Sequence, residues 1–189
     1  MTADVDVSNG NVQLKFNNTG NAGVVFHVYD RLHLDRIPRR YTVEADKSLN
    51  DRWDTRTWDA GKYDLEVHGP NGFLRTFKGT TMVSAQAAQP EAKLAYDVRA
   101  REVVIKAHND GKHNVKLTLV ANAYRTGGAV TLNLQHGDDV EHHVSVDHSG
   151  CWYDLTVSDA TSGFERRFAG RMETGRPSVT DPAMATELS

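Results

Sequence analysis

Two stretches of this sequence carry the same order of residues about ninety positions apart. The first is GKYDLEVHGPNGFLRTFKG, from Gly61 to Gly79, and the second is GCWYDLTVSDATSGFERRFAG, from Gly150 to Gly170. In both, a tyrosine and a leucine alternate with polar residues, and a Phe-x-Arg-x-Phe string follows. Alternation of this kind is typical of half-buried β-strands. The repeat therefore predicts two copies of one β unit in a single chain.

The upstream parts of the two copies also match. Three apolar residues that alternate with polar ones recur 91 positions later, and so do an asparagine and a glycine in the loop that follows. The matched pairs are Val12 and Val103, Leu14 and Ile105, Phe16 and Ala107, Asn18 and Asn109, and Gly20 and Gly111. Asparagine and glycine tolerate positive φ, so these loops suit hairpins.

Each copy holds about six or seven short strand patterns, which is the density of an all-β sandwich. We therefore predict an all-β protein with two tandem immunoglobulin-like Greek-key β-sandwich domains. The expected parts are a first repeat at 1–83, a small, polar linker at 84–91, a second repeat at 92–171 and a surface tail at 172–189. No segment shows a helical period over three turns.

The composition narrows the classes of protein. Apolar residues make up 39% and charged residues 25%, as in globular proteins. The net charge of −3 provides no broad basic surface, so nucleic acid is not an expected partner. No apolar run is long enough to span a bilayer and no signal peptide opens the chain, so we expect a soluble piece of a longer protein.

The single cysteine, Cys151, excludes an intramolecular disulfide. A buried apolar role is favoured for it over a reactive thiol.

The repeated string is interpreted as structural. Tyr63 and Tyr153 resemble the tyrosine corner of Greek-key sandwiches, in which the hydroxyl bonds nearby backbone. Arg75 and Arg166 fall between phenylalanines on a core face, so each is expected at the sandwich rim with a partner or over a ring, rather than as a ligand-binding group. The structural repeat residues are Tyr63, Leu65, Phe73, Arg75 and Phe77, matched by Tyr153, Leu155, Phe164, Arg166 and Phe168.

The pair of repeats, with FHVYDRLHLDRIPRRYTVE in the first, resembles the duplicated C-terminal domains of bacterial phosphocholine-preferring phospholipases C, of the non-haemolytic and haemolytic type. The resemblance implies that hydrolysis of phosphatidylcholine or sphingomyelin belongs to a separate N-terminal catalytic domain. None of that domain's catalytic residues carries over, so this fragment is expected not to be an enzyme.

The same resemblance implies the partners. They are the N-terminal catalytic domain of the parent chain and, as a second candidate, a phospholipid membrane surface. It also implies a parent that is periplasmic or secreted, exported by the twin-arginine route. The alternative function is a free-standing adhesion or carbohydrate-binding β-sandwich module.

The segment from Asp30 to Tyr41 is the main interaction candidate, because basic residues alternate there with Leu32, Leu34 and Ile37. The basic residues are Arg31, His33, Arg36, Arg39 and Arg40. Three interpretations stay open: contact with lipid or substrate, docking on the catalytic domain, and a plain solvated loop. Trp53 and Trp58 suit either an aromatic platform for sugar or choline, or the filling of a core.

The histidines invite a metal hypothesis, above all His136, His142, His143 and His148, together with His108 and His113. A zinc site needs three or four converging ligands, and neighbours such as His142 and His143 point to opposite faces of a strand. Surface histidines are therefore favoured, and no metal is expected. No nucleophile, phosphate-binding or paired-cysteine motif occurs, so no cofactor is expected either.

Overall fold

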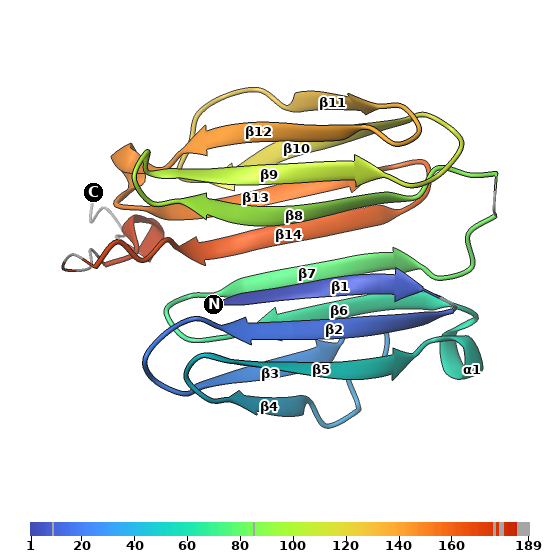
Figure 1. Cartoon of the computed structure of the whole chain (residues 1–189), viewed down its shortest axis with the longest axis horizontal. Helices are drawn as coiled ribbons and strands as arrows, with labels where there is room; N and C mark the ends of the chain where they lie inside the picture. The colour runs from blue at the N-terminus through green and yellow to red at the C-terminus, as the bar shows by residue number, and fades with distance from the viewer. Residues whose placement is uncertain (9, 85, 176, 178–179, 185–189) are drawn as a thin grey trace. The chain divides into compact units, whose positions relative to one another are not determined.

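The computed structural model of the 189-residue chain describes residues 1–8, 10–84, 86–175, 177 and 180–184. Contacts divide the chain into two units. Unit 1 is Met1–Ser84 with Ala160–Arg166, and unit 2 is Ala85–Asp159 with Arg167–Ser189. Both are built from antiparallel strands (Figure 1). The predicted all-β class is confirmed, while the immunoglobulin-like assignment and the predicted domain boundaries stay predictions.

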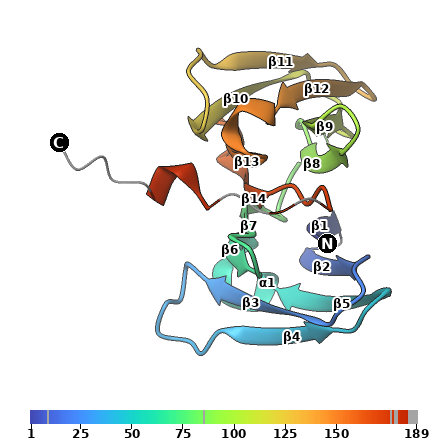
Figure 2. The ribbon, with the colours of Figure 1, turned by 90° about the vertical axis from the view of Figure 1, so that its left-hand side faces the viewer.

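Unit 1 contains the sheet β1-β2-β5 and the strands β7-β6-β3-β4, which follow one another in this order in a second sheet. The strands are β1 (Thr2–Ser8), β2 (Asn11–Asn18), β3 (Val24–Asp30), β4 (Arg39–Val43), β5 (Lys47–Asp54), β6 (Lys62–His68) and β7 (Leu74–Thr80). The view in Figure 2 shows β1, β2 and β5 as a layer separate from β3, β6 and β7. In β2 the apolar residues are buried and those between them are exposed, as their alternation predicts.

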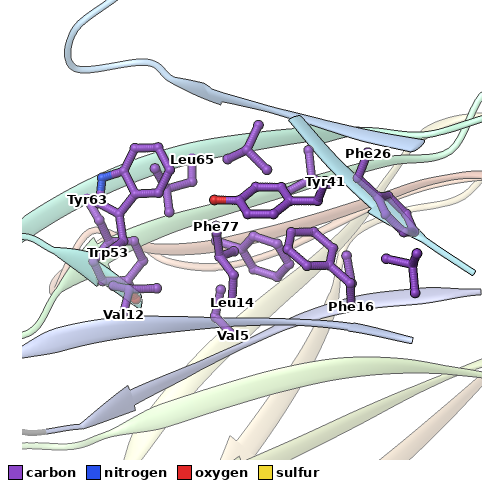
Figure 3. Close-up of a cluster of buried hydrophobic side chains, with 14 of the residues drawn as sticks. Val5, Val12, Leu14, Phe16, Phe26, Tyr41, Trp53, Tyr63, Leu65 and Phe77 are labelled. Atoms are coloured by element: carbon purple, nitrogen blue, oxygen red, sulfur yellow. The ribbon is translucent and has the colours of Figure 1, made fainter. Parts of the chain in front are cut away.

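The core of unit 1 lies between these two sheets and is drawn in Figure 3. Phe16 from β2 stacks on Phe26 from β3 and on Tyr41 from β4, with ring centroids 5.0 and 4.7 Å apart. Leu14 from β2 and Leu65 from β6 are both fully buried in the same cluster. Since both layers contribute to one apolar interior, unit 1 is a β-sandwich.

Unit 2 repeats this arrangement strand by strand, with the sheet β12-β9-β8 and with the strands β11-β10-β13-β14 in this order in a second sheet. The strands are β8 (Pro90–Asp97), β9 (Glu102–Asn109), β10 (Val115–Ala123), β11 (Val130–Leu134), β12 (Asp139–Ser145), β13 (Trp152–Asp159) and β14 (Phe164–Arg171). The first three residues of β14 count with unit 1 by their contacts. The matched residues Val103, Ile105 and Ala107 of β9 are buried, like their counterparts in β2. The duplication seen in the sequence is therefore a duplication of the same strand order.

A buried asparagine closes the hairpin loop after β2 and its counterpart after β9. Asn18 Nδ2 donates to the carbonyl oxygens of Ala22 (2.8 Å), Val43 (3.2 Å) and Glu44 (3.1 Å). Its Oδ1 accepts a hydrogen bond from Gly20 N at 3.0 Å. This side chain therefore joins the β2–β3 loop to the end of β4.

Helices are few and short in the described part of the chain. They are α1 (Arg56–Asp59) and two 3₁₀ turns, η1 (Asp147–Ser149) and η2 (Pro182–Met184). None of them has the length and apolar character needed to cross a bilayer.

Two left-handed residues in a row precede β6 and β13. They are Ala60 (φ 49°) and Gly61 (φ 82°) in the first repeat, and Gly150 (φ 64°) and Cys151 (φ 72°) in the second. Each pair contains one glycine, which adopts positive φ at little cost, and one residue with a Cβ that is strained there. Cys151 is buried, in agreement with its interpretation as a small apolar residue.

Candidate functional site

The candidate site is the β3–β4 connection, residues 31–38, together with the flanking residues of the predicted segment. Asp30, the buried last residue of β3, organises this loop. Its Oδ1 accepts a hydrogen bond from Leu32 N (3.1 Å), and its Oδ2 accepts one from Arg36 Nη1 (3.0 Å). Backbone bonds from His33 N to Asp30 O and from Arg36 N to His33 O, both 3.0 Å, form two successive turns. The loop is thus held by defined contacts rather than extended freely into solvent.

A short hydrogen bond fastens the loop to α1. His33 Nε2 lies 2.5 Å from Asp59 Oδ1, although the two residues are 26 positions apart. The helix itself is fixed by buried Thr55, whose Oγ1 donates to Gly10 O at 3.3 Å and whose carbonyl accepts from Asp59 N at 3.0 Å. Asp59 therefore provides a fixed anchor, and the loop and the helix form one surface.

The side chains of Asp30, His33 and Asp59 could also hold a metal ion. One ligand atom each from Asp30, His33 and Asp59 lies within 4.8 Å of the others, and two carboxylates with an imidazole suit a divalent cation. However, Asp30 already pairs with Arg36, and Asp59 with His33. Because each carboxylate already has a protein partner, these side chains hold the loop against α1 without a bound ion.

Three of the four arginines of the segment are paired with carboxylates, and two of these carboxylate partners lie on other strands. Arg31 pairs with Glu66 at 3.3 Å and lies 3.7 Å from Asp64, both in β6. Burial raises the pKa of Asp64, although the charge of Arg31 opposes this. Arg40 is exposed and takes part in no ion pair within the described residues. A partner can therefore reach the cation of Arg40 without breaking an ion pair.

Arg39 belongs to a second polar cluster, with Tyr41 and Asp51. Arg39 Nη1 lies 2.9 Å from Asp51 Oδ2, and Tyr41 Oη donates to the same oxygen at 2.5 Å. Burial, assisted by this bond to a carboxylate, raises the pKa of Tyr41 to about 12. Burial opposes the ionisation of Asp51, but the hydrogen bonds from Tyr41, Arg52 N and Arg39 outweigh it, so its pKa is lowered.

The two tryptophans have different environments. Trp53 is 7% exposed and lies in the core of unit 1, with the Arg39 guanidinium 4.0 Å from its ring centroid. The indole is therefore covered and offers no platform, which agrees with the core-filling alternative and removes Trp53 as a contact candidate. Trp58 in α1 faces solvent instead. Three more large apolar side chains of the site are exposed, Leu32, Leu34 and Ile37.

The chain matches the family model described as bacterial phospholipase C, C-terminal domain, over residues 1–80 and 90–171. This chain belongs to that family. The predicted resemblance is confirmed, and the match places the chain in the C-terminal part of such enzymes.

Individual relatives of this phospholipase C C-terminal domain agree. The chain is 43% identical over 177 residues to a non-hemolytic phospholipase C of Pseudomonas aeruginosa, covering 92% of the chain and 25% of the relative. It is 44% identical over 184 residues to a non-hemolytic phospholipase C of Burkholderia pseudomallei, covering 96% and 26%. With the hemolytic phospholipase C of P. aeruginosa it shares 33% over 192 residues, covering 94% and 26%. The chain thus spans about a quarter of the length of these relatives.

The repeated arginines of this phospholipase C domain are buried, and each has hydrogen-bond acceptors and an aromatic ring beside it. Arg75 is 2% exposed, lies 4.2 Å from the ring centroid of Phe73 and donates to Leu74 O at 2.8 Å. Arg166 belongs to unit 1 by its contacts and donates to Tyr63 Oη and Lys78 O, both at 2.9 Å. Buried guanidinium groups need such acceptors, which is why aromatic faces and carbonyl oxygens surround them.

The other repeated residues pack inside the domain. Tyr63, Leu65, Phe73, Phe77, Tyr153, Leu155, Phe164 and Phe168 are all buried. Tyr153 Oη lies 2.6 Å from Tyr96 Oη, while Tyr63 accepts from Arg166, so a side chain bonds each repeated hydroxyl. The bond to nearby backbone expected of a tyrosine corner stays a prediction.

The histidines of the second repeat are dispersed. Along β12, His142 is partly buried and His143 is exposed, as their opposite faces require. Burial and the charge of Arg125 lower the pKa of His142. His108 lies between Asp110 (2.8 Å) and Asp139 (2.9 Å), and these bonds raise its pKa. In the described residues, the one cluster with the geometry to hold a metal ion is that of Asp30, His33 and Asp59 in unit 1.

The second repeat has valines at the positions where the first repeat has Trp53 and Arg39. Val144 pairs with Val103 as Trp53 pairs with Val12, and Val130 stands where the first repeat has Arg39. A pocket of about 40 Å³ lies there, lined by Leu119, Val130, Val144 and Leu155 with Arg125 and His142. The candidate surface is therefore a property of unit 1.

Proposed function

We propose that this chain is the accessory C-terminal region of a bacterial phospholipase C that hydrolyses phosphatidylcholine or sphingomyelin. One observation carries the proposal: at least 92% of the chain aligns with phospholipases C, yet it spans about a quarter of their length. In this proposal the chemistry belongs to the remaining part of the parent chain. All three named relatives are phospholipases C, which favours this function over an adhesion or carbohydrate-binding module.

The role proposed for the two sandwiches is to support the catalytic domain of the parent. Antiparallel sandwiches with buried aromatic cores provide a rigid support, since a closely packed interior resists deformation. The single cysteine is buried, so the fold rests on packing and needs no disulfide. This suits a parent that folds before export to the periplasm or the medium.

The test compares the parent enzyme with and without these residues. We expect the isolated chain to leave p-nitrophenyl phosphorylcholine intact, and the parent truncated before Met1 to lose thermal stability and activity on phosphatidylcholine. Addition of the isolated chain to the truncated enzyme should restore part of both. Sustained turnover by the purified chain alone, or a truncated enzyme as stable and active as the parent, would contradict the proposal.

A further inference from the structure

Leu34, Ile37 and Trp58 are the three most exposed large apolar side chains of the described residues, and we call them the apolar cap. These side chains are 76%, 91% and 70% exposed. Exposed apolar residues scattered singly are ordinary, but these three lie on two segments that the His33–Asp59 bond holds together. Their exposure therefore has a common location and calls for an explanation by binding.

The cap is presented in a fixed shape. The turns around Asp30 define the loop, and Thr55 and Asp59 define the position of the helix. A surface that is already ordered loses little conformational entropy when a partner covers it. The cap is thus prepared for contact before any partner arrives.

The charges around the cap indicate what kind of partner it fits. Three of the four arginines in the segment are paired, Arg31 with Glu66, Arg36 with Asp30 and Arg39 with Asp51. A polyanionic partner requires cations that are free to pair with it. Arg40 and, in α1, Arg56 have no ion pair among the described residues, while the other arginines are balanced by carboxylates of the same surface. With most of its cations already balanced, the surface suits an interface with little net charge.

We propose that the apolar cap inserts into the interfacial layer of a zwitterionic phospholipid bilayer, with Leu34 and Ile37 entering the acyl boundary and Trp58 at the level of the headgroups. An indole combines an apolar body with one N–H donor, which is why tryptophan suits this depth. Interfacial binding grows with the apolar area that leaves water. The choice of phosphatidylcholine as the lipid rests on the proposed function.

The first experiment measures binding of the 189-residue chain to phosphatidylcholine vesicles by co-sedimentation. We expect binding that depends little on salt, and a Leu34→Ser/Ile37→Ser variant that binds at least about tenfold more weakly, since two large apolar groups no longer leave water. The matched control is Val98→Ser/Val120→Ser, which removes two exposed apolar side chains of unit 2. The control should bind like the original chain, and circular dichroism should show both variants folded.

The second measurement follows tryptophan fluorescence. Insertion should shift the emission to shorter wavelength, and Trp58→Phe should abolish the shift because Trp53 is already buried and Trp152 is partly buried in unit 2. Absence of binding to phosphatidylcholine vesicles would overturn the inference, and so would binding that requires anionic lipid and disappears with salt. If the double serine variant instead weakens restoration of the truncated enzyme on a water-soluble substrate, the cap docks on the catalytic domain. In that case the inference fails while the proposed function stands.

Discussion

Replacement of Asn18 by alanine tests whether the buried asparagine network holds the first sandwich together. The side chain is 1% exposed, and its amide group donates to three carbonyl oxygens, of Ala22, Val43 and Glu44, and accepts from Gly20 N. With two N–H donors and one oxygen, it makes the equivalent of about three hydrogen bonds. Each hydrogen bond contributes about 1 kcal/mol, and the substitution also leaves carbonyl groups unsatisfied. Asn18→Ala should therefore lower the free energy of unfolding by about 3 kcal/mol.

The second repeat provides an independent copy of the same test. Asn109 is fully buried and donates to His113 O (2.9 Å) and Gln135 O (3.2 Å). Its Oδ1 accepts from Gly111 N (3.1 Å) and Gln89 N (3.0 Å). We therefore expect Asn109→Ala to cost as much as Asn18→Ala or somewhat more.

The assay is urea unfolding followed by circular dichroism and by fluorescence, because Trp53 reports on unit 1 and Trp152 on unit 2. The control is Asn17→Ala, one position earlier on the exposed face, where the side chain bonds only at the surface, to Ser48 Oγ at 3.0 Å. It should cost less than about 0.5 kcal/mol. The reasoning would be refuted if Asn18→Ala lowered the stability no more than the control does.

Three further predictions concern backbone fit and pH, and urea unfolding measures all of them. A Cβ on Gly111 would lie 2.2 Å from Gln89 N, whereas one on Gly20 would have no neighbour nearer than 3.1 Å. Gly111→Ala should therefore destabilise by at least about 2 kcal/mol, and Gly20→Ala by clearly less; equal costs would contradict this. Ala60 is exposed with φ at 49°, so Ala60→Gly should stabilise by about 0.5–1 kcal/mol, and a loss of stability would show that no strain exists there. Because the folded pKa of Tyr41 is raised to about 12, its contribution is present below about pH 10 and is lost as the pH rises towards 12. In Tyr41→Phe the free energy of unfolding should fall less steeply above about pH 10. An unchanged pH dependence would show that Tyr41 does not cause the loss.

The sequence alone determined the strands and their duplication. Alternation along β2 and β9 assigns each residue to a face, because successive side chains of a strand point in opposite directions. Loop asparagines and glycines mark the hairpins, since these residues adopt conformations that others avoid. Such signals are local, so they are visible without any knowledge of which strands become neighbours.

Only the tertiary structure decided what the basic segment can do. Its arginines look available in the sequence, but β5 and β6 bring Asp51 and Glu66 against Arg39 and Arg31. Two tryptophans five positions apart share a pattern, yet pairing of β5 with β2 buries Trp53, while the turn into α1 leaves Trp58 in solvent. These outcomes depend on sheet order and on which distant segments meet. Periodicity carries no information about such contacts, because it describes one strand at a time.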